Sequence, residues 1–280
     1  MPIHFFKHIN SIDDEHVINV RVPDSLQEFV EGFYVFKKRS INGRQLLFND
    51  GYPVVIISPR RNSQNQIDIQ GKKQVLDAMW VCGGVLKNVY WELDVCLEDT
   101  LVVRFYPITF YKLFGIPENY FEKRQVVSFS EIAGSRFGIF LDSYYKFAVN
   151  EEKIKAVTAF ITEKIGDCSY PRVLVDILDH IDKCKGQLIV RELLERYGNR
   201  LNYKWLERNF KKHLGISPQQ YILLQRFLNA YLDLEASSSK DLLQIAIDNG
   251  YSDDNHFIKD FRQYSGMPPK TYFQSLGKNS

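Results

Sequence analysis

The sequence has few cysteines and lacks the short motifs that mark common catalytic and metal sites. Its four cysteines, Cys82, Cys96, Cys168 and Cys184, are far apart and form no C-x-x-C pair, which argues against a disulfide framework or a zinc ribbon. No G-x-S-x-G, H-E-x-x-H or glycine-rich phosphate loop is present. We therefore expect structural thiols, no enzymatic activity and no cofactor.

The chain also lacks a membrane-length apolar run and a signal-like N-terminus. We expect a cytoplasmic protein without membrane association. His4 and His8 have the i, i+4 spacing of a helical metal pair, and His16 follows, but no third ligand has a matching spacing and Phe5 and Phe6 favour ordinary packing. The prediction is no metal site.

Charge of one sign is scarce, because the net charge of the 280 residues is only +2. Lys and Arg nevertheless outnumber Asp and Glu by three in residues 186–280, whereas the two are balanced in residues 1–150. A basic excess confined to one region is what a phosphate-binding surface requires.

The length exceeds the roughly 250 residues that one core usually supports, so we expect more than one domain.

An internal repeat lies near the C-terminus. Residues 202–221 recur at 253–272 with a constant offset of 51 positions, as the pairs Phe210 and Phe261, Gly215 and Gly266, Pro218 and Pro269, and Tyr221 and Tyr272 show. Apolar residues at i, i+4 spacing predict one buried face per helix, glycine predicts a left-handed helix stop, and proline suits the start of the next helix.

Each repeat is preceded by another short helical pattern and a glycine turn. Residues 190–197 precede Gly198 and a helix capped by Asn202, and residues 241–249 precede Gly250 and a helix capped by Asp253. A helix, a tight turn and a capped second helix form the helix-turn-helix plan, whose second helix enters the major groove of DNA.

Residues 186–275 resemble the tandem helix-turn-helix domain of the AraC/XylS transcription regulators. The resemblance is carried by Leu206, Arg208, Phe210, Lys211, Gly215, Ser217-Pro218, Tyr221 and Arg226, then by Ile245-Ala246, Gly250-Tyr251-Ser252, Asn255, Phe257, Phe261, Gly266, Pro269 and Tyr272. It implies a sequence-specific regulator bound to double-stranded DNA, with RNA polymerase as a candidate further partner. Leu194 and the long turn 198–201 depart from the family pattern in the first unit.

By position, the resemblance assigns base-edge roles to Lys204, Glu207 and Arg208 in the first recognition helix. In the second it assigns them to Asp254, Asn255 and Lys259. The candidate DNA-binding residues on these faces are Tyr203, Lys204, Glu207, Arg208 and Lys211, then Asp254, Asn255, Lys259 and Arg262. Arg and Lys suit guanine, Asn suits adenine and Glu suits the cytosine amino group. For each residue taken singly, an exposed polar or charged side chain without a DNA contact is an equally good interpretation. For Arg226 in the connecting helix we expect an acidic partner.

The N-terminal part predicts a β domain. Between residues 30 and 107, short runs rich in Val, Ile and aromatics alternate with Asn-Gly, Asp-Gly and Gly-Gly turns, which is typical of antiparallel strands. We expect a small sandwich or partial barrel in domain 1–132, and residues 24–132 resemble a β domain that precedes such repeats in some regulators. A candidate effector pocket comprises Trp80, Tyr90, Trp91, Arg104 and Tyr106, whose alternative is ordinary core or interface packing.

Residues 133–185 predict a helical connector, since apolar residues recur at helical spacing in 151–165 and 171–181. These stripes pack against the β domain or form a dimer interface, so monomer and homodimer both stay open. The whole chain is then an α+β multidomain protein with an all-α tandem helix-turn-helix domain at 186–280. The alternative function is a helical protein-interaction or scaffold module that does not bind DNA.

Overall fold

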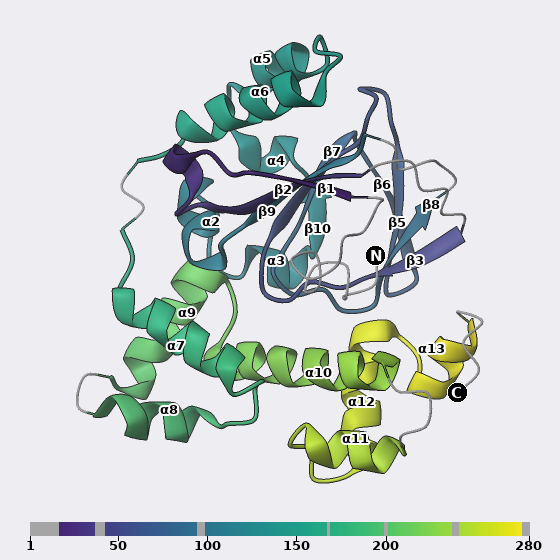
Figure 1. Ribbon diagram of the computed structural model, residues 1–280, viewed down its shortest axis with the longest axis vertical. Coiled ribbons are helices and arrows are strands. Elements are labelled where there is room, and N and C mark those ends of the chain that lie inside the picture. The colour runs from purple at the N-terminus through teal and green to yellow at the C-terminus, as the bar shows by residue number, and fades with distance from the viewer. Residues whose placement is uncertain are drawn as a thin grey trace.

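The computed structural model describes residues 17–36, 43–93, 99–166, 169–198, 201–236 and 241–275. His4, His8, His16, Cys96 and Cys168 lie outside these residues. The described chain forms a two-sheet β domain, a helical layer on one side of it and a row of helices on another, as Figure 1 shows. The α+β architecture expected from the sequence is confirmed.

The β domain contains two antiparallel sheets. The larger has the strand order β1-β2-β9-β4-β7-β10 and the smaller has the order β3-β8-β5-β6. The strands are β1 (Val17–Val20), β2 (Val30–Phe36), β3 (Gly43–Leu47), β4 (Val54–Ile57), β5 (Asn65–Ile69), β6 (Lys72–Leu76), β7 (Met79–Cys82), β8 (Val89–Leu93), β9 (Leu101–Phe105) and β10 (Val126–Ser128).

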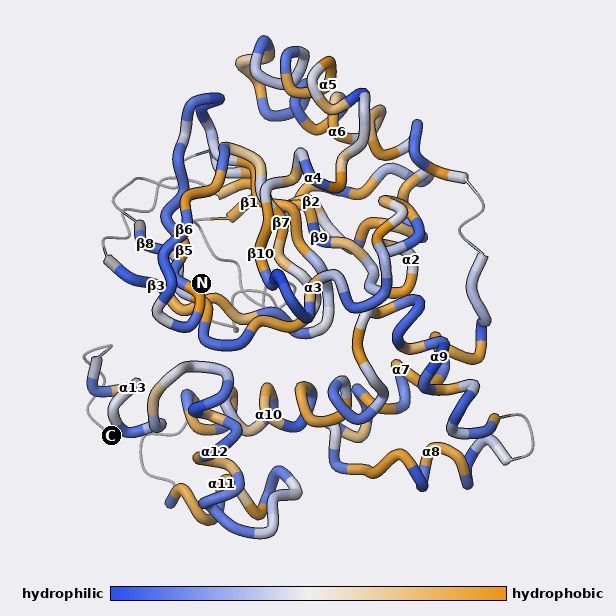
Figure 2. Tube along the Cα trace, turned by 180° about the vertical axis from the view of Figure 1, so that it is seen from behind, coloured by the Kyte–Doolittle hydropathy of each residue, from blue (hydrophilic) through white to orange (hydrophobic). Residues whose placement is uncertain are grey.

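The two faces of the larger sheet enter two different cores because side chains alternate along a strand. On β4, Val54 and Ile56 face the smaller sheet, whereas Val55 and Ile57 face the helical layer. Strands β4, β7 and β9 are therefore buried on both faces. Figure 2 shows β7 as mostly hydrophobic, in contrast to the largely hydrophilic hairpin β5–β6.

Short helices cover the outer face of the larger sheet. They are η1 (Asp24–Leu26), α2 (Pro107–Leu113), α3 (Tyr120–Lys123), α4 (Ser130–Ala133), α5 (Phe137–Tyr144) and α6 (Asn150–Thr162). Phe140 of α5 and Phe160 of α6 stack with ring centroids 4.3 Å apart and join the core beneath this layer. Helices α5 and α6 thus belong to the β domain by their packing.

The remaining helices form the C-terminal domain. They are α7 (Arg172–Lys183), α8 (Val190–Tyr197), α9 (Tyr203–Leu214), α10 (Pro218–Ala236), α11 (Leu242–Asp248), α12 (Asp254–Ser265) and α13 (Pro269–Ser275). Helix α7 buries Leu174, Ile177 and Ile181 in one core with Leu206 and Phe210 of α9. The connector expected at 133–185 is therefore divided between two cores, and α7 packs with the helical domain that we expected to begin at residue 186.

The β domain and the helical domain share apolar cores. Leu46 and Phe48 from the smaller sheet side pack with Phe227 and Tyr231 of α10, and the Phe48 and Tyr231 ring centroids are 4.9 Å apart. Ile108 of α2 enters the core of the first helix-turn-helix unit. In Figure 1, α10 runs along the β domain, with α7–α9 at one end and α11–α13 at the other.

Candidate DNA-binding interface

Helix α9 is a polar helix with one apolar stripe, which determines the face turned outward. Leu206 and Phe210 are fully buried. The side chain of Asn202 accepts a hydrogen bond from the backbone N–H of Trp205 at 2.8 Å and caps the helix start. Gly215, with φ of 71°, ends the helix in the left-handed region. The cap and the stop expected from the sequence are confirmed.

The outward face of α9 carries the five candidate residues of the first unit. Tyr203, Lys204 and Arg208 are exposed. Glu207 and Lys211 are half-buried and form an ion pair of 3.0 Å. Glu207 raises the pKa of Lys211, mainly by accepting its hydrogen bond. Arg208 and Lys204 are therefore the freely presented cations, while the charge of Lys211 is partly compensated.

Helix α12 repeats this construction. Phe257 and Phe261 are fully buried, and the Asp253 carboxylate accepts a hydrogen bond from the N–H of His256 at 2.9 Å. This bond is the main reason why the pKa of Asp253 is lowered. Gly266, with φ of 81°, ends the helix. Asp253 thus has a structural role as a helix cap, as expected.

The candidate residues of the second unit lie on the exposed side of α12. Asn255, Lys259 and Arg262 are exposed, and Asp254 is half-buried in the first helical turn. A carboxylate in that turn is favoured by the partial positive charge of the helix N-terminus. The acidic start of α12 therefore has a folding explanation that is independent of any DNA contact.

Helix α10 connects the two units as one straight element of 19 residues that begins at Pro218. At 1.5 Å per residue it spans about 28 Å, comparable with the roughly 34 Å between successive major grooves on one face of DNA. Arg226 of α10 donates to the carbonyl oxygens of Gly186 at 3.1 Å and Leu188 at 3.3 Å. Arg226 thus binds two backbone carbonyls, and the acidic group that interacts with it electrostatically is Asp260 of α12.

The five residues of the candidate effector pocket occupy different surroundings. Trp80 and Trp91 lie between the two sheets, with ring centroids 5.0 Å apart in a T-shaped arrangement. The hydroxyl of Tyr90 donates to the carbonyl of Ser265 in the helical domain at 2.5 Å, and Tyr106 packs beside the first-unit core. These side chains therefore lie in separate packing environments: Trp80 and Trp91 contact each other, and Tyr106 lies against Tyr52.

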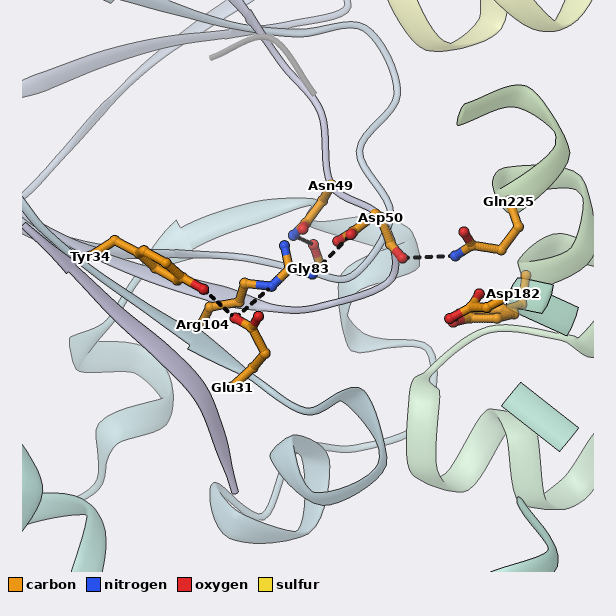
Figure 3. A network of polar contacts seen from close by, with 9 residues as sticks. Glu31, Tyr34, Asn49, Asp50, Gly83, Arg104, Asp182 and Gln225 are labelled. Atoms are coloured by element: carbon orange, nitrogen blue, oxygen red, sulfur yellow. Dashed lines mark hydrogen bonds and ion pairs between the residues drawn. The ribbon is translucent and has the colours of Figure 1, made fainter. Parts of the chain in front are cut away.

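Arg104 is the fifth of these residues and lies in a buried charge network, drawn in Figure 3. Its guanidinium pairs with Glu31 at 3.0 Å and with Asp50 at 2.8 Å, and it lies 4.2 Å from the centroid of the Tyr52 ring. The backbone carbonyl of Asp50 accepts a hydrogen bond from Gln225 of α10 at 2.9 Å. The network therefore ties β9 to the connecting helix.

A cavity of about 480 Å³ lies where the β domain meets both helix-turn-helix units. Burial lowers the pKa of Lys87 and raises that of Asp260 on its two sides. None of the five candidate pocket residues lines it, and no sequence motif marked it. Its walls comprise Gln70, Gly84, Val85, Lys87, Tyr111, Phe121, Glu122, Gln125, Gly215, Ile216, Gln220, Leu223, Asp260, Gln263 and Tyr264.

No group of three or more His, Cys, Asp or Glu side chains suited to a metal ion occurs in the part of the chain that the structure describes. Within those same ranges, no helix is both long and apolar enough to cross a membrane.

Two helix-turn-helix units, each with one exposed polar helix face and joined by α10, define a tandem helix-turn-helix domain. In agreement, a protein family described as "Helix-turn-helix domain" matches residues 200–275. The C-terminal domain is of the AraC type that the sequence resemblance indicated. The matched part begins after α8, so it includes both recognition helices and the complete second unit.

The matching relatives are transcription regulators. The chain is 28% identical over 119 residues to the transcriptional activator RhaS of Pectobacterium atrosepticum. This match covers 36% of this chain and 42% of RhaS. It is 37% identical over 65 residues to the transcriptional regulator GbdR of Pseudomonas aeruginosa, 23% of this chain and 17% of that protein. These matches thus span less than half of the relatives' lengths.

Among solved structures, the chain is similar to ToxT from Vibrio cholerae. The TM-score is 0.43 at 12% sequence identity, and the alignment covers 92% of this chain and 98% of ToxT.

Proposed function

We propose that this protein is a sequence-specific transcription regulator that inserts α9 and α12 into successive major grooves of double-stranded DNA. The observation that carries the proposal is the pair of equivalent capped helices, each with an exposed polar face, on the two ends of α10. RhaS and GbdR, which match in this region, are themselves transcription regulators. RNA polymerase stays a candidate partner on the strength of this resemblance.

The side chains on the two faces suit base recognition. Arg208 and Lys204 are exposed cations that match guanine O6 and N7, and Asn255 matches adenine N6 and N7. We assign Lys211, held by Glu207, to phosphate positioning. Phosphate contacts add affinity but carry no sequence information.

Selection of bound duplexes from a random pool tests the proposal. A preferred sequence with two conserved elements about 10 base pairs apart is the expected result. On that sequence, Arg208→Ala should cost about 1–3 kcal/mol of binding free energy and relax one base preference. Arg136→Ala is a matched control, because Arg136 pairs with Glu163 on the distant α5–α6 layer. An equal loss from Arg208→Ala on all sequences would reassign that residue to phosphate.

The alternative, a protein-interaction module, makes a different prediction. It gives no DNA affinity that depends on salt, whereas a regulator that neutralises several phosphates loses affinity steeply as salt rises. Titration of one duplex at 50 and at 200 mM salt separates the two functions.

We propose the interdomain cavity, in place of the five predicted pocket residues, as the candidate effector site. A volume near 480 Å³ lies in the range of small-molecule sites. Its lining combines apolar contact surface from Tyr111, Phe121 and Ile216 with polar and charged side chains, which suits a ligand with both kinds of surface. A thermal-shift screen against common metabolites should give a hit that Leu223→Trp, which narrows the cavity, removes. A hit that Leu223→Trp leaves unchanged would place the ligand elsewhere.

A further inference from the structure

The β domain touches the same point on both recognition helices. Gly215 and Gly266 are 51 residues apart, occupy equivalent positions in the repeat and end α9 and α12 with φ of 71° and 81°. A methyl group added to Gly215 would lie 2.7 Å from Cε1 of Tyr111, and one added to Gly266 would lie 2.7 Å from Cγ of Asn88. Both distances are too short for carbon atoms, so each glycine admits a β-domain side chain.

At α12 the β domain also binds the last helical carbonyls. The backbone N–H of Asn88 donates to the carbonyl of Tyr264 at 2.7 Å, and the Tyr90 hydroxyl donates to the carbonyl of Ser265 at 2.5 Å. Carbonyls in the last turn have no partner within their own helix. The β domain therefore supplies hydrogen bonds that α12 cannot make itself.

At α9 the contact is made mainly by packing. Helix α2 lies along α9, and Tyr111 of α2 is only 2% exposed. One turn earlier, Ile108 of α2 is buried in the core of the first unit together with Leu214 of α9. The end of α9 is therefore held by a side chain that cannot move without disturbing the β-domain core.

These two contacts make the β domain a second connection between the reading helices, beside α10. A single connecting helix sets the distance between two units but resists their tilting only at its own junctions. A body that also contacts the C-terminal end of each reading helix restricts that tilt. We infer that the β domain fixes the relative placement of α9 and α12, with Tyr111 and Asn88 as positioning residues. The inference rests on the proposed function, since the placement matters only if both helices read DNA.

The consequence is selectivity for the spacing of the two DNA elements. One inserted base pair moves the second element by about 3.4 Å and rotates it by roughly 35° about the DNA axis. If the β domain holds the two reading helices in fixed positions, they cannot both contact their DNA elements at the altered spacing, so contacts at one element are lost. If this docking is loosened, the second helix can shift with its element and keep its contacts.

The test compares spacing profiles of full-length proteins. A combined variant, Tyr111→Leu, Asn88→Gly and Tyr90→Phe, removes the Tyr111 ring, the Asn88 side chain and the Tyr90 hydroxyl. Glycine tolerates the φ of 53° at position 88. Tyr145→Phe is the matched control, because the Tyr145 hydroxyl donates to the carbonyl of Ser58 at 3.0 Å within the β domain. Fluorescence anisotropy gives the Kd for the selected duplex and for duplexes with one base pair inserted or deleted between the elements.

Wild-type protein and the Tyr145→Phe control should bind the displaced duplexes at least tenfold more weakly than the selected duplex. In the combined variant this ratio should fall at least threefold. If the combined variant does not fold, Asn88→Gly alone should lower the ratio in the same direction. An unchanged ratio in folded variants would overturn the inference and leave α10 as the only positioning element. Absence of any preferred duplex for the wild-type protein would instead overturn the proposed function.

Discussion

Substitution of Gly215 by alanine distinguishes the helix-stop role of this residue from its docking role. A left-handed backbone costs a residue with a β-carbon roughly 1–2 kcal/mol. Gly115, which follows α2 with φ of 61°, has nothing within 4 Å of an added methyl group. Gly115→Ala therefore measures the backbone cost alone and should destabilise the protein by about 1–2 kcal/mol.

At Gly215 the added methyl group also meets the Tyr111 ring, which is buried and cannot swing into solvent. Overpacking of this kind costs roughly 1–3 kcal/mol. Gly215→Ala should thus lower the free energy of unfolding by about 2–5 kcal/mol in total. Urea denaturation followed by circular dichroism gives both values, provided that the transition stays cooperative.

A double-mutant cycle isolates the contact with Tyr111. Tyr111→Leu clears the ring atoms nearest to Gly215, so in that background Gly215→Ala should cost no more than Gly115→Ala does in the wild-type protein. Equal destabilisation by Gly215→Ala and Gly115→Ala in the wild-type background would refute the close approach of the β domain to α9.

Three further predictions concern stability. Asp50→Asn leaves the buried Arg104 with one carboxylate fewer and should cost about 3–5 kcal/mol, whereas Asp142→Asn breaks an exposed pair and should cost less than about 1 kcal/mol in the same urea assay. Burial lowers the pKa of His213, so the unfolded chain takes up the proton first and the free energy of unfolding should fall as pH drops through about 6.5. His213→Gln should lose less stability than the wild-type protein between pH 7.5 and 5.5. An equal loss in the two proteins would contradict this. Asn202→Ala should lower the melting temperature by removing about 1 kcal/mol of helix capping, and Asn202→Ser should restore most of it.

Features with a local cause were predictable from the sequence. The caps at Asn202 and Asp253 and the stops at Gly215 and Gly266 depend on the chemistry of one residue and its nearest neighbours, and the structure confirms all four. Strands β3, β4, β7, β8 and β9 followed likewise from apolar runs and turn residues. Hairpin β5–β6 was missed because β6 is mostly polar and its turn, Gln70-Gly71, is not a common hairpin pair.

Features that depend on a distant partner were not predictable. The apolar stripe of α7 indicated burial, but nothing in its periodicity says that Ile177 faces the first helix-turn-helix unit instead of the β domain. Alternation placed Trp80 and Trp91 inside the β domain without showing that they pack on each other. The helix-stop role alone accounts for Gly215 and Gly266, so their contacts with Tyr111 and Asn88 left no signal in a single sequence.

The central claim is that both recognition helices read DNA from one chain. The most direct measurement is the Kd, by fluorescence anisotropy at fixed salt, of the selected duplex and of two duplexes in which one or the other element is scrambled. We expect each scrambled duplex to bind at least tenfold more weakly, because each loses the base contacts of one helix while keeping the phosphate contacts. Equal affinity for all three duplexes would contradict the claim.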